Sequence, residues 1–209
     1  MAAWLWYFAR VDSTGFTIWL TGLPCSGKST IARKLARRLL ARGRRVEVLD
    51  GDLIRRSLSH GLGFTREDRD RNILRVAFVA NLLARNDVVV IVAVVSPYRA
   101  ARDEARRVLR RFFEVHVDCP LDECERRDVK GMYARARAGT LHGFTGIDDP
   151  YEVPLAPELS LSTSVQSSDE SAERVESALV ESGLLSVNDP QLGDSPEIEQ
   201  RYSELFLWR

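Results

Sequence analysis

The segment Thr17-Ile-Trp-Leu-Thr-Gly22-Leu-Pro-Cys-Ser-Gly27-Lys28-Ser29-Thr30 decides the fold of this chain. From Gly22 it matches the G-x-x-x-x-G-K-[ST] phosphate loop, in which backbone N–H groups surround phosphate oxygens. The residues before Gly22 are typical of a buried strand, and Ile31 to Arg42 carries apolar residues at helical spacing. A strand, a glycine-rich turn and a helix in this order are the context in which the motif binds phosphate.

The phosphate loop predicts an ATP site. Lys28 is expected to reach the β- and γ-phosphates, and the Ser29 hydroxyl is expected to bind Mg²⁺, the cofactor of such transfers. The predicted ATP-binding residues of the loop are Gly22, Leu23, Pro24, Cys25, Ser26, Gly27, Lys28, Ser29 and Thr30. Such a loop specifies nucleotide binding and leaves the reaction open. The chain has no Asn-Lys-x-Asp guanine-binding motif, which argues against a GTP-binding regulator.

Strand and helix patterns alternate along the rest of the chain. Strands are predicted at 46–49, 88–95, 114–117 and 159–162, and helices at 67–85, 99–111, 121–138 (interrupted at Gly131) and 171–182. The alternation predicts the α/β class, as a three-layer phosphate-loop kinase fold with a mostly parallel central sheet. Residues 139–158 are rich in Gly, Pro and Asp and are expected to form a loop or a mobile flap.

The predicted kinase domain covers residues 15–185, after an N-terminal extension at 1–14. Residues 186–209 are a C-terminal appendage of unknown role, with a polar linker and then a half-apolar run from Ile198. This run fits a short amphipathic helix that docks on the body or on a partner, and it fits an irregular terminus equally well.

Composition narrows the classes of partner. With 44% hydrophobic residues in 209, the chain can bury the core of one domain. Residues 1–146 hold 27 of the 30 basic residues, and a basic body suits anionic ligands such as nucleotides. Three irregularly spaced cysteines suit neither a disulfide framework nor a zinc site, which favours a cytoplasmic location. No apolar run is long enough to span a bilayer. Neither a membrane nor a nucleic acid is predicted as a partner.

The sequence Asp50-Gly51-Asp52 follows the second predicted strand at its carboxyl end, where parallel sheets bind their ligands. Asp52 or Asp50 is a candidate catalytic base for an attacking hydroxyl. Asp50 is also, with Ser29, a candidate ligand of Mg²⁺. A turn in which an aspartate caps a helix is the alternative interpretation.

Several further segments make the chain similar to adenylyl-sulfate kinases, in the order of that family and over roughly residues 15–185. The segments are Thr17-Ile-Trp-Leu-Thr-Gly-Leu-Pro, Leu49-Asp-Gly-Asp-Leu-Ile-Arg55, Gly63-Phe-Thr-Arg-Glu-Asp-Arg69, Asn72-Ile73, Val95-Ser-Pro-Tyr-Arg99, Cys124-Glu-Arg-Arg-Asp-Val-Lys-Gly131, Ala136-Arg-Ala-Gly and Gly143-Phe-Thr-Gly-Ile-Asp-Asp-Pro-Tyr-Glu152. The resemblance implies a kinase that moves the γ-phosphate of ATP to the 3′-hydroxyl of adenosine 5′-phosphosulfate (adenylyl sulfate). The product would be 3′-phosphoadenylyl sulfate.

The resemblance also implies roles for matching residues. The implied catalytic residues are Asp52, Asp50, Lys28 and Ser96, and the implied substrate contacts are Arg55, Phe64, Arg69, Asn72, Val95, Ser96, Lys130 and Phe144. Two arginines and Asn72 would hold the phosphosulfate and ribose, and the two phenylalanines would clamp the adenine ring. Arg127 would lie against the adenine of ATP. Ser96 matches a serine described as a phosphoserine intermediate. Direct transfer, with Ser96 only orienting the substrate, is the mechanism that we expect, because phosphoryl transfer needs little covalent help.

The chain departs from the family pattern at three positions: His142 stands where Lys is frequent, Val129 replaces a Pro, and Cys25 replaces Gly or Ala. The resemblance implies a homodimer and functional coupling to ATP sulfurylase. Two other functions remain open at this stage. One is another small-molecule kinase, of the gluconate or nucleoside type, and the other is a non-catalytic nucleotide sensor.

Overall fold

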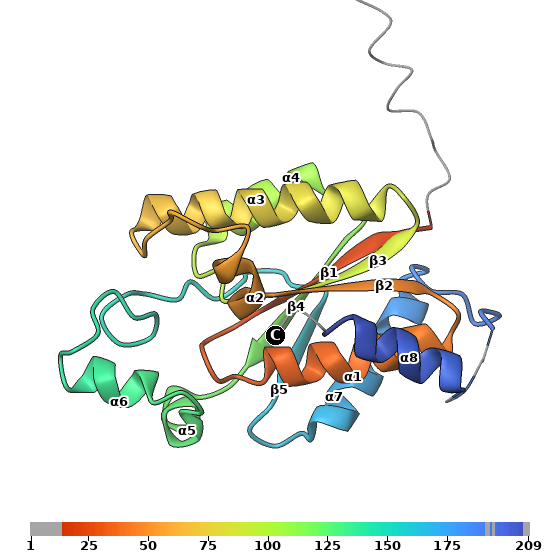
Figure 1. Ribbon diagram of the computed structural model, residues 1–209. Helices are drawn as coiled ribbons and strands as arrows, with labels where there is room; N and C mark the ends of the chain where they lie inside the picture. The colour runs from red at the N-terminus through yellow and green to blue at the C-terminus, as the bar shows by residue number, and fades with distance from the viewer. Residues whose placement is uncertain (1–13, 191–192, 194, 207–209) are drawn as a thin grey trace, which may run out of the picture.

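The computed structural model describes residues 14–190, 193 and 195–206. They form a parallel sheet of five strands, in the order β2-β3-β1-β4-β5, between two layers of helices (Figure 1). The strands are β1 (Phe16–Thr21), β2 (Arg45–Asp50), β3 (Val88–Ala93), β4 (Phe112–Asp118) and β5 (Leu159–Ser162). The predicted α/β class and the three layers are confirmed.

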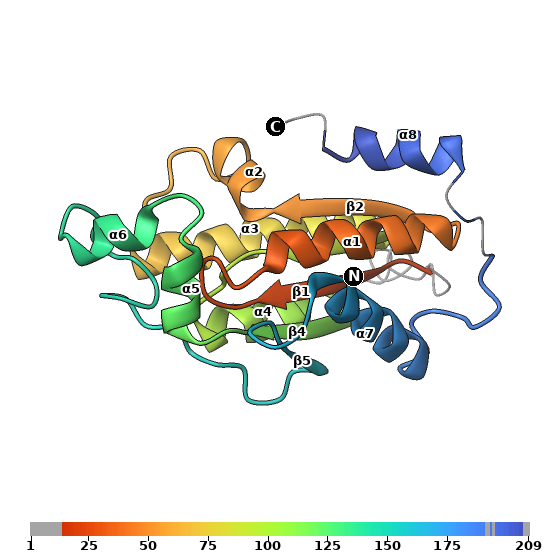
Figure 2. The ribbon, with the colours of Figure 1, turned by 90° about the horizontal axis from the view of Figure 1, so that it is seen from below.

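Helices cover both faces of this sheet. One face carries α1 (Lys28–Ala41) and α7 (Ser168–Glu181), and α8 (Pro196–Glu204) packs against α1 (Figure 2). The other face carries α3 (Arg66–Ala84) and α4 (Arg99–Val108). Three short helices lie near the carboxyl ends of the strands: α2 (Gly51–Arg56), α5 (Leu121–Arg127) and α6 (Met132–Arg137).

The central strands are apolar throughout because both of their faces are covered. Every residue of β1 is buried. Phe16, Ile18 and Leu20 belong to the core beneath α1 and α7, whereas Trp19 belongs to the core beneath α3 and α4. Such two-sided burial is the reason that parallel strands have near-continuous hydrophobic sequences.

Several predicted boundaries differ from the structure, and two of the differences have a clear local reason. Strand β3 ends at Ala93 and not at residue 95, because the chain leaves the sheet and carries Val95 to the cavity wall. Helix α4 ends at Val108 and not at residue 111, because the carbonyl of Arg111 already accepts a hydrogen bond from Thr17 N of β1. Helix α2 was foreseen only in the alternative interpretation of Asp50 as a helix cap, and the Asp50 side chain does accept a hydrogen bond from Asp52 N.

The C-terminal appendage contains a helix that docks on the body, which was one of its two interpretations. Residues 1–13 of the N-terminal extension lie outside the described residues. Among the helices that the structure describes, none is long and apolar enough to cross a membrane.

Candidate active site

The phosphate loop joins β1 to α1, and its two end glycines meet different demands. At Gly22 an added Cβ would lie 2.4 Å from the carbonyl oxygen of Val117, so no side chain fits there. Gly27 caps α1 with a left-handed backbone (φ 102°), which favours glycine. Because Gly27 has no capping side chain, the first-turn N–H groups of α1 are the donors that an anion would meet at this end.

Lys28 is almost fully buried beneath the loop. Its Nζ donates to the carbonyl oxygens of Gly22 (2.9 Å) and Leu23 (2.6 Å) and to Ser26 Oγ (3.2 Å). Burial lowers the pKa of Lys28 to about 8. The ammonium group is thus held at the loop with its charge weakly compensated, which favours an incoming polyanion.

We expect the affinity for ATP to fall as pH rises above about 8. Bound phosphates would raise the pKa of Lys28, so Lys28 would be protonated in both states below this pH and the affinity would be constant. Above it the free protein loses the proton and binding must restore it. Calorimetric titration in buffers of different ionisation enthalpy should therefore show proton uptake above pH 8, by linkage. Release of protons there would contradict this assignment.

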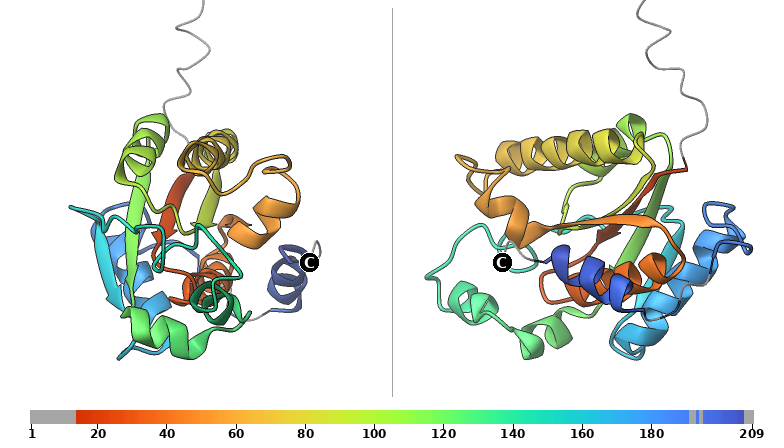
Figure 3. Two further views of the ribbon diagram at one scale, coloured as in Figure 1. Left: turned by 90° about the vertical axis from the view of Figure 1, so that its left-hand side faces the viewer. Right: turned by 45° about the vertical axis from the view of Figure 1, so that its right-hand side comes forward.

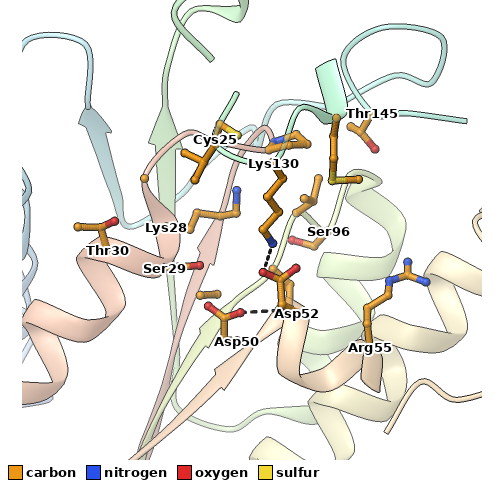
Figure 4. Close-up of a pocket in the computed structure, with 18 of the residues that line it drawn as sticks. Cys25, Lys28, Ser29, Thr30, Asp50, Asp52, Arg55, Ser96, Lys130 and Thr145 are labelled. Atoms are coloured by element: carbon orange, nitrogen blue, oxygen red, sulfur yellow. Dashed lines mark hydrogen bonds and ion pairs between the residues drawn. The ribbon is translucent and has the colours of Figure 1, made fainter. Parts of the chain in front are cut away.

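The acidic pair lies at the carboxyl end of β2, facing the loop (Figure 4). Asp50 Oδ1 accepts a hydrogen bond from Asp52 N at 3.0 Å, so the predicted alternative, a helix-capping aspartate, is correct for Asp50. Asp52 forms an ion pair with Lys130, which comes from the segment between α5 and α6. Both carboxylates line the same cavity as Lys28 and Ser29. Asp50 therefore caps α2 and also lines the candidate site.

At the other end of the cavity, Arg69 ties together two loops. It is 8% exposed, and it donates from Nε to Phe64 O (2.9 Å), from Nη1 to Thr145 Oγ1 (3.0 Å) and from Nη2 to Gly143 O. These bonds join the segment before α3 to the segment 139–158. The sequence predicts that Arg69 contacts the substrate. In the structure, its guanidinium already donates hydrogen bonds to protein acceptors.

Arg55 and the two predicted clamp residues differ in exposure. The guanidinium of Arg55 stacks over the ring of Phe64, 4.3 Å from the ring centroid. Phe64 is 53% exposed, whereas Phe144 is 6% exposed and packs edge-on against Tyr133. Burial and then the nearby Arg69 lower the pKa of Arg55. All three predicted residues line the cavity.

Ser96 is buried in a chain of hydrogen bonds, with a left-handed backbone (φ 41°). Trp19 Nε1 donates to Ser96 Oγ (3.1 Å), Ser96 Oγ donates to Thr21 Oγ1 (2.9 Å), and Thr21 Oγ1 donates to Val95 O (2.8 Å). The hydroxyl proton of Ser96 is thus directed at Thr21, and its oxygen already accepts a bond.

One cavity of about 1280 Å³ brings most of the predicted residues together. Its lining includes Pro24, Cys25, Gly27, Lys28, Ser29, Thr30, Asp50, Asp52, Arg55, Phe64, Arg69, Val95, Ser96, Arg127, Lys130 and Phe144. The predicted residues Gly22, Leu23, Ser26 and Asn72 are not part of the lining. Asn72 is buried instead, where its Oδ1 accepts a hydrogen bond from Ser59. Single small-molecule sites occupy roughly 300–1,000 Å³, so this cavity is larger than one typical site.

The sequence missed several lining residues, among them Arg33, Thr163, Gln166, Leu205 and Phe206. Thr163 Oγ1 donates to Ser26 O (2.8 Å), and Arg127 Nη2 donates to Thr163 O (2.6 Å). These bonds hold the end of β5 against the phosphate loop. No local motif marks such residues, because only the fold brings them to the loop.

A phosphate loop, an acidic pair at the next strand and a second basic, aromatic pocket in one cavity define a phosphate-loop kinase. Comparison with known proteins specifies the family. The adenylylsulphate kinase family model matches residues 14–162. An adenylyl-sulfate kinase of Picosynechococcus is 52% identical over 175 residues, which are 84% of this chain and 99% of that protein. This chain belongs to the adenylylsulphate kinase family.

Solved structures agree with this assignment. The APS kinase of Mycobacterium tuberculosis, determined in complex with AMPPNP and APS, matches with a TM-score of 0.77 and 47% identity. The match covers 79% of this chain and 97% of that one. A hexameric APS kinase from Thiobacillus denitrificans matches with a TM-score of 0.63 and 36% identity, over 82% of this chain and 30% of that one.

Proposed function

We propose that this kinase transfers the γ-phosphate of ATP to the 3′-hydroxyl of adenylyl sulfate, giving 3′-phosphoadenylyl sulfate. The observation that carries the proposal is the single cavity with the phosphate loop at one end and the Arg55, Phe64 and Phe144 pocket at the other. A planar base suits the exposed aromatic ring of Phe64. The phosphosulfate dianion suits the guanidinium fork of Arg55.

The residues present fit Mg²⁺ as the cofactor. Ser29 and Asp50 supply hard oxygen ligands in the cavity. The part of the chain that the structure describes has no group of three or more His, Cys, Asp or Glu side chains that could hold a metal ion by itself. Mg²⁺ at phosphate-transfer sites is held by one or two protein groups together with substrate phosphates. When bound, it would neutralise charge that develops on the transferred phosphoryl group.

The positions of Lys28, Asp52 and Lys130 in the cavity support a role for each in this reaction. Lys28 stabilises charge on the β- and γ-phosphates. Asp52 accepts the proton of the 3′-hydroxyl once the substrate displaces Lys130, and the freed Lys130 then faces the phosphates. The segment 139–158, with Lys130, closes the cavity and excludes water, which suppresses ATP hydrolysis.

The test is a coupled ATP-consumption assay with three acceptors: adenylyl sulfate, gluconate and none. We expect turnover with adenylyl sulfate alone and 3′-phosphoadenylyl sulfate as the product. Turnover with gluconate alone would support a sugar-acid kinase. Nucleotide binding without turnover on any acceptor would support a sensor. Light scattering of the same sample tests the homodimer that we propose on the basis of family resemblance.

We expect Ser96→Ala to remain active, within about tenfold of the wild type, because Ser96 only orients the substrate. The variant should be less stable by about 1–3 kcal/mol, since Trp19 Nε1 loses its acceptor. The control is Thr21→Val, which breaks the same series of hydrogen bonds and leaves the Ser96 hydroxyl in place. Incubation with γ-labelled ATP alone tests the covalent alternative. Label on Ser96 that moves to added adenylyl sulfate at the rate of turnover would make Ser96 the nucleophile.

A further inference from the structure

The C-terminal helix α8 is built into the kinase core. Ile198 is 1% exposed within the main core cluster, and Tyr202, Leu205 and Phe206 pack against that cluster. Figures 2 and 3 show α8 alongside α1, on the side of α1 away from α7. The family model ends at residue 162, so this helix lies outside the matched region.

The contacts between α8 and α1 repeat at two levels. Arg37 forms an ion pair with Glu199 (2.8 Å), and its guanidinium lies over the ring of Tyr202, 5.7 Å from the centroid. About one helical turn nearer the phosphate loop, the guanidinium of Arg33 lies over the ring of Phe206, 5.8 Å from the centroid. Only the second level reaches the cavity: Arg33, Leu205 and Phe206 line it, and Arg37 and Tyr202 do not.

The contacts of Arg33 with the described residues leave part of its guanidinium without a hydrogen-bond partner. Its Nε is buried and has no hydrogen-bond partner among the described residues. Long side chains on a helix point back toward its N-terminus, which here is the end with the phosphate loop. Thr30, about one turn before Arg33, lines the same cavity. The guanidinium of Arg33 is therefore expected at the cavity wall, on the side of its own Cα nearer the phosphate loop.

We propose that Arg33 of α1 and Phe206 of the C-terminal appendage together form a further part of the ATP site. Arg33 contacts the phosphate chain of the nucleotide near Thr30. Phe206 holds the guanidinium in place through a cation–π contact, and with Leu205 it closes the outer wall of the cavity. This inference rests on the proposed function only in that ATP occupies the phosphate-loop end.

The test is direct binding of AMPPNP and of adenosine, with no acceptor present, to the full chain and its variants. Arg33→Ala should weaken AMPPNP binding about tenfold and adenosine binding less than about twofold, since a charged contact to phosphate is lost. Phe206→Ala should weaken AMPPNP binding about fivefold. The double variant should lose less than the product of the two, because the two side chains act as a unit.

Tyr202→Ala is the matched control, because it removes the equivalent ring over Arg37 outside the cavity. It should change AMPPNP affinity less than about twofold, although it should lower thermal stability about as much as Phe206→Ala does. If Tyr202→Ala and Phe206→Ala weakened AMPPNP binding equally, α8 would only stabilise the fold, and Phe206 would have no role in the ATP site. Unchanged AMPPNP affinity in Arg33→Ala would overturn the proposal. Both outcomes are measured without a phosphate acceptor. A failure of the proposed reaction would appear in the ATP-consumption assay and not in these binding measurements.

Discussion

Lys28→Ala is expected to lower kcat by about 10²–10³-fold or more, because one charge-stabilising group in a water-excluded site contributes roughly 3–4 kcal/mol. In the structure the ammonium group bonds to the loop through Gly22 O and Leu23 O, within reach of any phosphate that the loop encloses. Single-turnover measurements with saturating ATP and adenylyl sulfate isolate the loss in the chemical step.

The same variant should keep its fold. The lowered pKa of Lys28, about 8, means that burial disfavours its charge, so removing the charge relieves a cost. Lys34→Ala is the control, because Lys34 belongs to the same helix and pairs with Asp169 outside the cavity. It should retain wild-type turnover. Wild-type turnover in Lys28→Ala would contradict the assignment of this loop to ATP binding. Unfolding of the variant would show that Lys28 has a structural role instead.

Arg69→Ala is expected to lower kcat/KM for adenylyl sulfate by about 10²-fold, because the loss of its bonds shifts the loops that position the substrate, and small misplacements cost about that much. Arg69 lies 3.5 Å from Asp149 and holds the segments of Phe64 and Gly143. Without it both aromatic residues lose their placement. The resemblance alone would predict a much larger loss of binding for the sulfated ligand than for a sulfate-free analogue. The contacts predict similar losses for adenylyl sulfate and for AMP, a sulfate-free analogue.

Arg55→Ala provides the contrast. Arg55 lines the cavity, stacks on Phe64 and has a hydrogen bond to Gly63 O (3.0 Å). We expect its loss to weaken the binding of adenylyl sulfate more than that of AMP, because we propose that Arg55 binds the phosphosulfate. Competition binding of both ligands to both variants measures the difference. A loss in Arg69→Ala that spares AMP would show that Arg69 contacts the phosphosulfate directly and would refute its role as a loop anchor.

The sequence by itself determined the features that depend on near neighbours along the chain. The apolar run before Gly22, the spacing of the glycines and the helical period after Lys28 predicted the strand, loop and helix that form the phosphate end. The run Val88–Val95 predicted a strand buried on both faces for the same reason, and the strand forms over Val88–Ala93. Local backbone preference and hydrophobic period act over a few residues and can be recognised there.

Only the tertiary structure decided which side chains face the cavity and which face one another. Asn72 shares a helix with Arg69, yet it bonds to Ser59 away from the cavity. Lys130 reaches Asp52 across 78 residues of sequence, and Phe206 reaches Arg33 from an appendage that carries no motif. Such pairings depend on how the sheet orders its strands and on which helix faces meet. A charge or a ring alone does not specify its partner, so these contacts arise only when the chain has folded.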